Sequence, residues 1–212
     1  GLIGYNYNTT TNLINVKNSD ITSSTITGGS YVGGLVGNIN NTTSANNTLE
    51  SNTAVDTTVN SGTFAGLLFG KLYNGGVTTI SIKDSSTSGT LNSTGEYVGG
   101  TIGSIAIVDS SSSITLDNLS NSANITGNRV GGILGQIDSS GTAHVVISNL
   151  TNEGTISKYN NNTYYGGVIG VLNNTGIGVM EMSDSHSTGK VIGYNQTGGL
   201  IGLVQNINQG TT

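Results

Sequence analysis

The chain has 212 residues, of which 33% are apolar and only 8% are charged, and its formal net charge is −5. This composition excludes simple disorder, because disordered chains usually lack apolar residues and carry a large net charge. With only six lysines and arginines in an acidic chain, we expect no nucleic-acid partner and no anionic membrane partner.

The chain contains neither proline nor cysteine. Proline cannot donate to a β ladder, so its absence fits strands that follow one another almost without a break. The absence of cysteine excludes a disulfide framework and a thiolate metal site. No apolar run approaches the roughly 18 residues of a membrane-spanning helix, so we expect no transmembrane segment.

A glycine-rich motif recurs in chain order as "YVGGLVGNI", "FAGLLFGKL", "EYVGGTIGSI", "RVGGILGQI", "YYGGVIGVL" and "TGGLIGLV". Its first glycines are Gly33, Gly66, Gly99, Gly131, Gly166 and Gly198, at intervals of 33, 33, 32, 35 and 32 residues. A fixed period of this size indicates a solenoid. We therefore expect one repeat array over 1–212, with coils at about 1–32, 33–65, 66–98, 99–130, 131–165, 166–197 and a partial coil at 198–212.

A second set of runs lies between the glycine motifs and includes "INV", "ISI", "ITL" and "VVI". Their alternation of apolar and polar residues predicts β-strands, and no segment shows a sustained helical period. The sequence thus predicts an all-β fold, a β-solenoid (β-helix) of about six to seven coils, with about 33 residues and three short strands per coil.

Alignment of the coils places amide and carboxyl side chains in one column, formed by Asn18, Asn52, Asp84, Asn118, Asn149 and Asp184. Asn tolerates the left-handed backbone of corners and can bond to Asn in the next coil, so we expect an internal polar ladder. The alternative is that Asn is simply abundant in this chain. The next column contains Lys17, Ser51, Lys83 and Asp117, and an exposed Lys83–Asp117 pair would contribute at most about 1 kcal/mol.

The glycine motif also aligns apolar residues, one column being Ile3, Val36, Phe69, Ile102, Leu134, Ile169 and Ile201. The preceding residues, such as Leu35 and Leu68, form a second apolar column. Neighbouring residues of a regular strand point to opposite faces, so one column would lie outside as a flat surface for lateral contact. The alternative is a glycine bulge that turns both columns inward, where the missing side chains permit tight packing.

An aromatic column lies beside this motif and consists of Tyr31, Phe64, Tyr97 and Tyr164. Two interpretations stay open for it, a stack that stiffens the sheet and a strip that faces glycans. Sequons in turn-like clusters mark four candidate N-glycosylation positions, namely Asn41, Asn46, Asn161 and Asn173. We expect Asn118 and Asn149, as members of the internal ladder, to be unmodified.

Residues for catalysis or cofactor binding do not cluster in the repeat. His144 and His186 occupy different phases, and Asp84 and Asp184 share a column but lie three coils apart, too far for a carboxylate pair. We therefore expect no enzyme activity, no catalytic residues, no cofactor and no metal site. Ice binding would need Thr-x-Thr arrays, and "TTT" and "TTIS" do not recur in phase.

The motifs "GGLVG", "GGILG", "GGVIG" and "GGLIG", alternating with "ISNLTNEGTIS" and "SDSHSTGKVIG", resemble the GLUG repeats of large bacterial surface and secreted proteins. The resemblance covers nearly the whole chain and implies a β-solenoid stalk or passenger at the cell surface or outside the cell. The resemblance also extends to surface-anchored proteases whose catalytic residues lie outside the repeats. No His-Glu-x-x-His motif is present in this chain, so we expect no protease activity from it.

Residues 1 to about 14 and 199–212 occupy the same phase of the repeat, so we expect either that the rod continues in a longer polypeptide or that copies self-assemble, head to tail or laterally. The sequence therefore predicts a structural fibre or stalk subunit. The alternative is an adhesin domain that binds glycan or a host surface protein.

Overall fold

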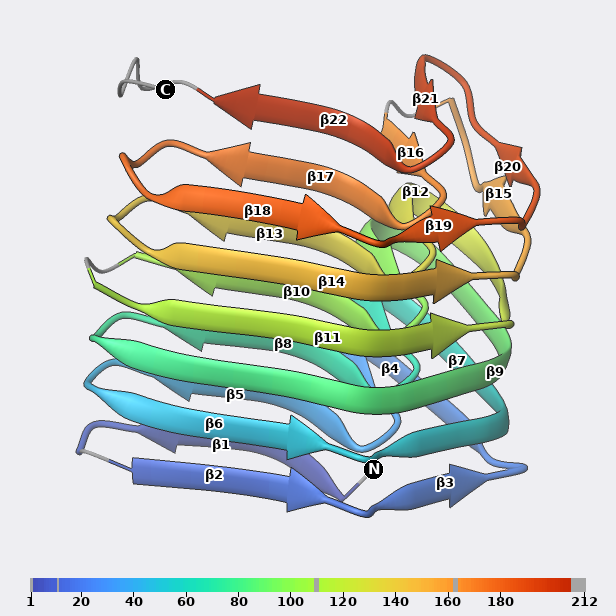
Figure 1. The fold of residues 1–212 in the computed structure, drawn as a ribbon. Coiled ribbons are helices and arrows are strands. Elements are labelled where there is room, and N and C mark those ends of the chain that lie inside the picture. The colour runs from blue at the N-terminus through green and yellow to red at the C-terminus, as the bar shows by residue number, and fades with distance from the viewer. Residues whose placement is uncertain (1, 11, 109–110, 162–163, 207–212) are drawn as a thin grey trace.

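The computed structural model describes residues 2–10, 12–108, 111–161 and 164–206. It is all-β, and its coils stack in parallel as a β-solenoid of about six turns, roughly 33 residues apart. Figure 1 shows the coils following one another along a single axis, from the N-terminal coil to the C-terminal coil. The predicted fold class is confirmed, while residues 207–212 of the predicted partial coil lie outside the described residues.

The first side of each coil belongs to a seven-stranded parallel sheet with the order β1-β5-β8-β10-β13-β17-β22. Its strands are β1 (Ile3–Asn8), β5 (Val36–Asn41), β8 (Phe69–Asn74), β10 (Ile102–Ile107), β13 (Leu134–Ser139), β17 (Ile169–Asn174) and β22 (Ile201–Asn206). Each strand pairs with the equivalent strand of the next coil, as Ile3 pairs with Val36 and Val36 with Phe69. The sequence repeat therefore becomes a repeat in space with unchanged register.

The other sides of the coils belong to a second, 15-stranded sheet. Its strands are β2 (Asn12–Lys17), β3 (Asp20–Thr22), β4 (Thr25–Gly33), β6 (Ala45–Glu50), β7 (Thr53–Gly66), β9 (Thr78–Gly99), β11 (Ser113–Asn121), β12 (Asn124–Gly131), β14 (His144–Asn152), β15 (Ile156–Lys158), β16 (Tyr164–Gly166), β18 (Val179–Ser183), β19 (His186–Ser187), β20 (Val191–Ile192) and β21 (Gln196–Gly198). Figure 1 shows this sheet bending around the solenoid, opposite and beside the first sheet.

Several of these strands are longer than the short strands that the sequence predicted, and β9 runs for 22 residues. Corners within it are made by single residues with left-handed backbone, such as Asp84 (φ 50°) and Tyr97 (φ 60°), and by Gly89 (φ 118°). A single-residue corner leaves the ladder with the neighbouring coils nearly continuous. The walls of the coil therefore merge into one bent sheet.

Both apolar columns of the glycine motif point into the core. Val36, Phe69 and Ile102 are at most 1% exposed, and Leu35 and Leu68 of the adjacent column are at most 4% exposed. The chain bends between β4 and β5, so consecutive residues can point to the same side instead of alternating. Of the two arrangements left open by the sequence, the structure therefore has the inward one, and neither column forms an outer lateral surface.

The glycines allow two stretches of backbone to cross in direct contact. A Cβ added to Gly70 would meet the carbonyl oxygen of Gly37 and would lie 2.8 Å from both Tyr31 C and Val32 N. Gly70 is not among the residues with left-handed backbone, so it is needed for space rather than for its conformation. The first residues of the strands in the first sheet thus lie directly against backbone near the ends of strands in the second sheet, such as Tyr31 and Val32 of β4.

Candidate functional site

A ladder of asparagines, partly buried at Asn8 and fully buried at Asn41 and Asn74, runs through the first three coils at the end of the first sheet. Asn8 Nδ2 donates to Asn41 Oδ1 at 3.0 Å, and Asn41 Nδ2 donates to Asn74 Oδ1 at 2.9 Å. Asn41 and Asn74 are fully buried. The prediction that Asn41 carries an N-glycan is therefore wrong, because its amide has no access to solvent and is already bonded on both sides.

A second buried ladder lies at a corner of the 15-stranded sheet. Thr87 Oγ1 donates to Asn121 Oδ1 at 2.8 Å, and Asn121 Nδ2 donates to Asn152 Oδ1 at 2.8 Å. Asn152 Nδ2 continues the ladder to Ser187 Oγ at 3.3 Å. Amide ladders of this kind fix the register of stacked strands, since a slip would leave buried donors without acceptors.

The column predicted to be an internal ladder instead lies at an exposed corner. Five of its residues have left-handed backbone, with φ between 48° and 55°, and all five are exposed. They are Asn18, Asp84, Asn118, Asn149 and Asp184. The predicted tolerance of Asn and Asp for this backbone is confirmed, but the predicted burial is wrong, because the corner turns the side chain outward. One side-chain bond along the column joins Asn118 Nδ2 to Asp84 Oδ1 at 2.7 Å. Burial therefore does not shield the sequons at Asn118 and Asn149.

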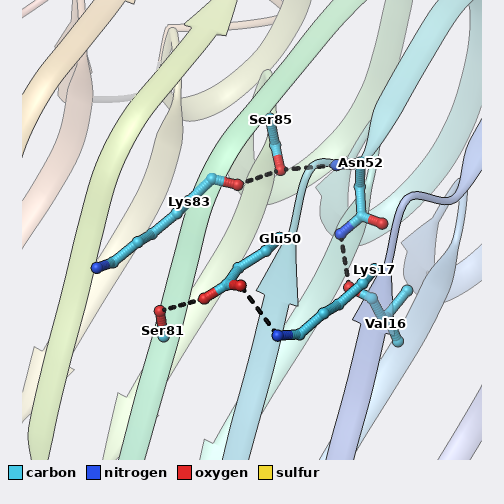
Figure 2. A network of polar contacts seen from close by, with 7 residues as sticks. All are labelled: Val16, Lys17, Glu50, Asn52, Ser81, Lys83 and Ser85. Atoms are coloured by element: carbon cyan, nitrogen blue, oxygen red, sulfur yellow. Dashed lines mark hydrogen bonds and ion pairs between the residues drawn. The ribbon is translucent and has the colours of Figure 1, made fainter.

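In the second coil, Ser51 and not Asn52 is equivalent to Asn18, because Lys17 pairs with Glu50. Ser51 holds the left-handed corner, with φ 54°, whereas Asn52 is buried and donates from Nδ2 to the Val16 carbonyl at 2.9 Å. Figure 2 shows this bond and the contact from the Asn52 backbone N–H to Ser85 Oγ, at 3.2 Å. Asn52 therefore belongs to the interior and not to the predicted column.

The same one-residue shift places Glu50, not Ser51, in the charged column beside the corner. This column consists of Lys17, Glu50, Lys83 and Asp117. Lys17 Nζ lies 3.1 Å from Glu50 Oε2, and Ser81 Oγ donates to Glu50 Oε1 at 3.0 Å (Figure 2). The Lys17 ammonium is the main reason that the pKa of Glu50 is lowered. Hydrogen bonds from Ser148 and Asn149, and then the charge of Lys83, lower the pKa of Asp117.

The aromatic column forms a stacked ladder on the outside of the bend between the two sheets. Ring centroids of Tyr31 and Phe64 are 5.2 Å apart, and those of Phe64 and Tyr97 are 5.4 Å apart, with interplanar angles of 24° and 25°. These three residues and Arg129 have left-handed backbone, with φ from 48° to 60°. Such a conformation is unusual for bulky residues and persists only where the surrounding structure fixes it.

Two cations complete this aromatic ladder. Lys71 Nζ lies 4.7 Å from the Phe64 ring centroid, and burial lowers the pKa of Lys71. Arg129 lies between Tyr97 and Tyr164, with its guanidinium carbon 5.1 Å and 5.5 Å from their ring centroids. Its Nη1 donates to Tyr97 Oη at 2.6 Å and to Glu96 Oε2 at 2.7 Å. Rings and the Arg129 guanidinium therefore occupy the faces of Phe64 and Tyr97, as a stiffening stack requires.

A two-column array of hydroxyl and amide side chains covers the outer face of β4, β7, β9, β12 and the chain around β15. We call it the threonine–asparagine array. One column is Thr25, Thr58, Thr90, Asn124 and Thr155, and the other is Thr27, Asn60, Asn92, Thr126 and Ser157. The sequence pattern does not predict this array through "TTT" and "TTIS", which are out of phase; the segments in phase are "TIT", "TVN", "TLN", "NIT" and "TIS".

The remaining predicted glycosylation positions differ in their accessibility. Asn46 and Asn161 are exposed, although residues 162 and 163 of the second sequon lie outside the described residues. Asn173 is partly buried, and its Nδ2 donates to Asp138 Oδ1 at 2.9 Å. Burial raises the pKa of Asp138. Asn46 and Asn161 therefore remain the two accessible predicted positions.

Groups that could bind a metal do not gather in the part of the chain that the structure describes, where no three His, Asp or Glu side chains lie together. His144 Nε2 lies 3.4 Å from Glu181 Oε1 on the surface, and His186 lies in β19. No helix long and apolar enough to cross a bilayer occurs in the described ranges.

Comparisons of the chain with protein-family models, with curated proteins and with solved structures gave no match. The resemblance to GLUG repeats therefore stays a prediction, and the fold and its surfaces carry the functional argument.

Proposed function

We propose that the chain is a non-enzymatic structural protein, the rod-forming part of an extracellular fibre or cell-surface stalk. The observation that supports this proposal is that equivalent strands of successive coils pair in parallel and in register, with local register shifts in the pairings of β7 with β9 and of β9 with β12. The column of Val16, for example, continues through Leu49 and Ile82 to Ile147 and Met182 without a shift. Coils that stack only on their neighbours form a stiff rod that can be extended by adding further coils.

Self-association is part of this proposal, because the first and last described coils present matching columns. Ile3 and Ile201 belong to one column, and both are only partly buried against the core. Ile26 and Val191 are a second partly buried pair of this kind. Stacking of the last coil on the first coil of another copy would continue these columns, and a further coil of a longer polypeptide would do the same.

An adhesin domain remains the alternative. The aromatic ladder gives it little support, because a sugar that stacks on an aromatic residue needs a free ring face, and the faces of Phe64 and Tyr97 are covered. The polar threonine–asparagine array is the surface that favours this alternative.

Sedimentation velocity of the purified chain over a range of concentrations tests self-association. We expect assemblies that grow with concentration, and we expect Met182→Glu to abolish them because it places a charge in the end column. Thr115→Glu, on the outer face of a central coil, is the matched control and should assemble normally. Assembly that is equally lost in both variants, or a wild-type chain that stays monomeric, would refute head-to-tail stacking.

A further inference from the structure

A groove lies along the threonine–asparagine array where Tyr159 stands beside it. Its volume is about 340 Å³, and its lining includes Asn60, Asn92, Ser61, Ser93, Thr126 and Tyr159. Three successive coils contribute these residues through β7, β9 and β12, and Tyr159 follows β15, where its N–H donates to the Gly127 carbonyl at 2.9 Å. A groove of this size is large enough for a small ligand.

The groove is neutral and rich in hydrogen-bonding groups. None of its lining side chains is ionisable near neutral pH, and the nearest lysine in sequence, Lys158, points its Nζ toward Asn161 Oδ1 and the Tyr194 ring. Asn92 Nδ2 donates to Asn60 Oδ1 at 3.3 Å, which leaves the second amide proton of Asn92 for a further bond. The serine hydroxyls are already engaged, since Ser61 Oγ donates to the Thr63 carbonyl at 3.1 Å and Ser93 Oγ accepts from the Gly95 N–H at 3.2 Å. An anionic or cationic ligand would find no opposite charge here.

Tyr159 differs from the residues of the aromatic ladder. The residue is 53% exposed, and within the described residues no other ring and no cation is stacked on it. A free aromatic face beside amides and hydroxyls combines an apolar surface with directional polar groups. Sugars present the same combination, because C–H groups line one face of the ring and hydroxyls surround its edge.

We propose that this groove binds a neutral oligosaccharide, with the Tyr159 ring against the apolar face of one sugar and the Asn60 and Asn92 amides bonded to its hydroxyls. The threonine–asparagine array would extend the contact to further sugars along the same wall. Binding of an oligosaccharide goes beyond the structural role, because one copy of the chain contains the whole groove and binding does not require self-assembly.

Nuclear magnetic resonance of the isotope-labelled chain tests the proposal directly. Neutral hexasaccharides of glucose, xylose, mannose and N-acetylglucosamine are titrated one at a time into protein made without N-glycosylation, because Asn92-Ser93-Thr94 is itself a sequon. We expect at least one sugar to shift the side-chain amide signals of Asn60 and Asn92 in a saturable manner. The absence of any saturable shift with all of these sugars would overturn the proposal.

Tyr159→Ala is the decisive variant, and Tyr7→Ala is its matched control because Tyr7, in β1, is 54% exposed and outside the groove. We expect Tyr159→Ala to weaken binding about tenfold and Tyr7→Ala to leave it unchanged. Equal binding by wild type and Tyr159→Ala would overturn the proposal. The array would then be a general polar surface, and the rod-forming function would be unaffected by that result.

Discussion

Asn41 Nδ2 donates to Asn74 Oδ1 at 2.9 Å inside the solenoid, between two residues that lie 33 positions apart in the chain. Asn47 Nδ2 donates to the same oxygen at 3.3 Å. Asn74 therefore joins two coils and two sides of one coil through a single buried carbonyl group.

Replacement of this residue should be costly. Asn74→Ala leaves the buried donors of Asn41 and Asn47 without their acceptor, and we expect a loss of about 2–3 kcal/mol in the free energy of unfolding. Urea denaturation followed by circular dichroism measures the change. Asn46→Ala, at an exposed position of β6, should stay within about 0.5 kcal/mol of wild type. Equal losses in the two variants would contradict the role assigned to the buried ladder.

The crossing of backbones predicts a strong contrast between two glycines of one column. Gly70→Ala would force a methyl group against the Gly37 carbonyl and the backbone at Tyr31, and we expect a loss of more than about 4 kcal/mol or failure to fold. Gly4 occupies the same column in the first coil, where an added Cβ would meet nothing within 4 Å. Thermal unfolding of Gly4→Ala should resemble that of wild type, and a large loss there would contradict the steric explanation.

The aromatic ladder should contribute to stability rather than to binding. Phe64→Ala removes two stacked contacts, with Tyr31 and Tyr97, and we expect a loss of about 1–3 kcal/mol beyond the effect of lost area. Phe64→Tyr keeps the ring and should preserve most of the stability. Chemical denaturation of both variants tests this, and the interpretation fails if Phe64→Ala is neutral.

Asp138 predicts a dependence of stability on pH. Burial raises the pKa of this carboxyl above its unfolded value of 3.8, so the stability that its protonated form contributes is present below that value and is lost as the pH rises through the folded pKa. Asp138→Asn removes the buried charge and keeps an oxygen to accept from Asn173 Nδ2. Because Asp138 is only half-buried, we expect a gain of less than about 1 kcal/mol at pH 7.

This gain should disappear near pH 3, where Asp138 is itself protonated. Glu50 and Asp117 have lowered pKa values and destabilise the fold in acid, but they do so equally in both proteins. Thermal unfolding at the two pH values separates the effects. A gain of the same size at both pH values would show that packing, and not the charge, is responsible.

The period of the chain could be predicted from the sequence because glycine is the only residue that fits where Gly37, Gly70 and Gly103 cross the neighbouring backbone. Which asparagines are buried and which are exposed could not be predicted in the same way. Asn52 and Asn18 look alike in the sequence, yet one is buried and the other is an exposed corner, because a shift by one residue exchanges inside and outside.

Long-range side-chain contacts were also beyond the sequence pattern. Arg129 looks like an interruption of the aromatic column, whereas the structure places its guanidinium between the rings of Tyr97 and Tyr164. The threonine–asparagine array could have been found, since "TIT" at 25–27 and "TVN" at 58–60 are one period apart. Tyr159 could not, because its position beside the groove depends on how the chain leaves β15.

Electron microscopy of the native material at neutral pH, with diffraction analysis of any fibres, tests the central claim most directly. If the chain forms a rod of stacked coils, thin fibres or stalks of uniform width should show a spacing of about 4.8 Å along their long axis, the distance between parallel strands. Compact particles without an elongated axis, or fibres with this spacing across their axis, would contradict the account.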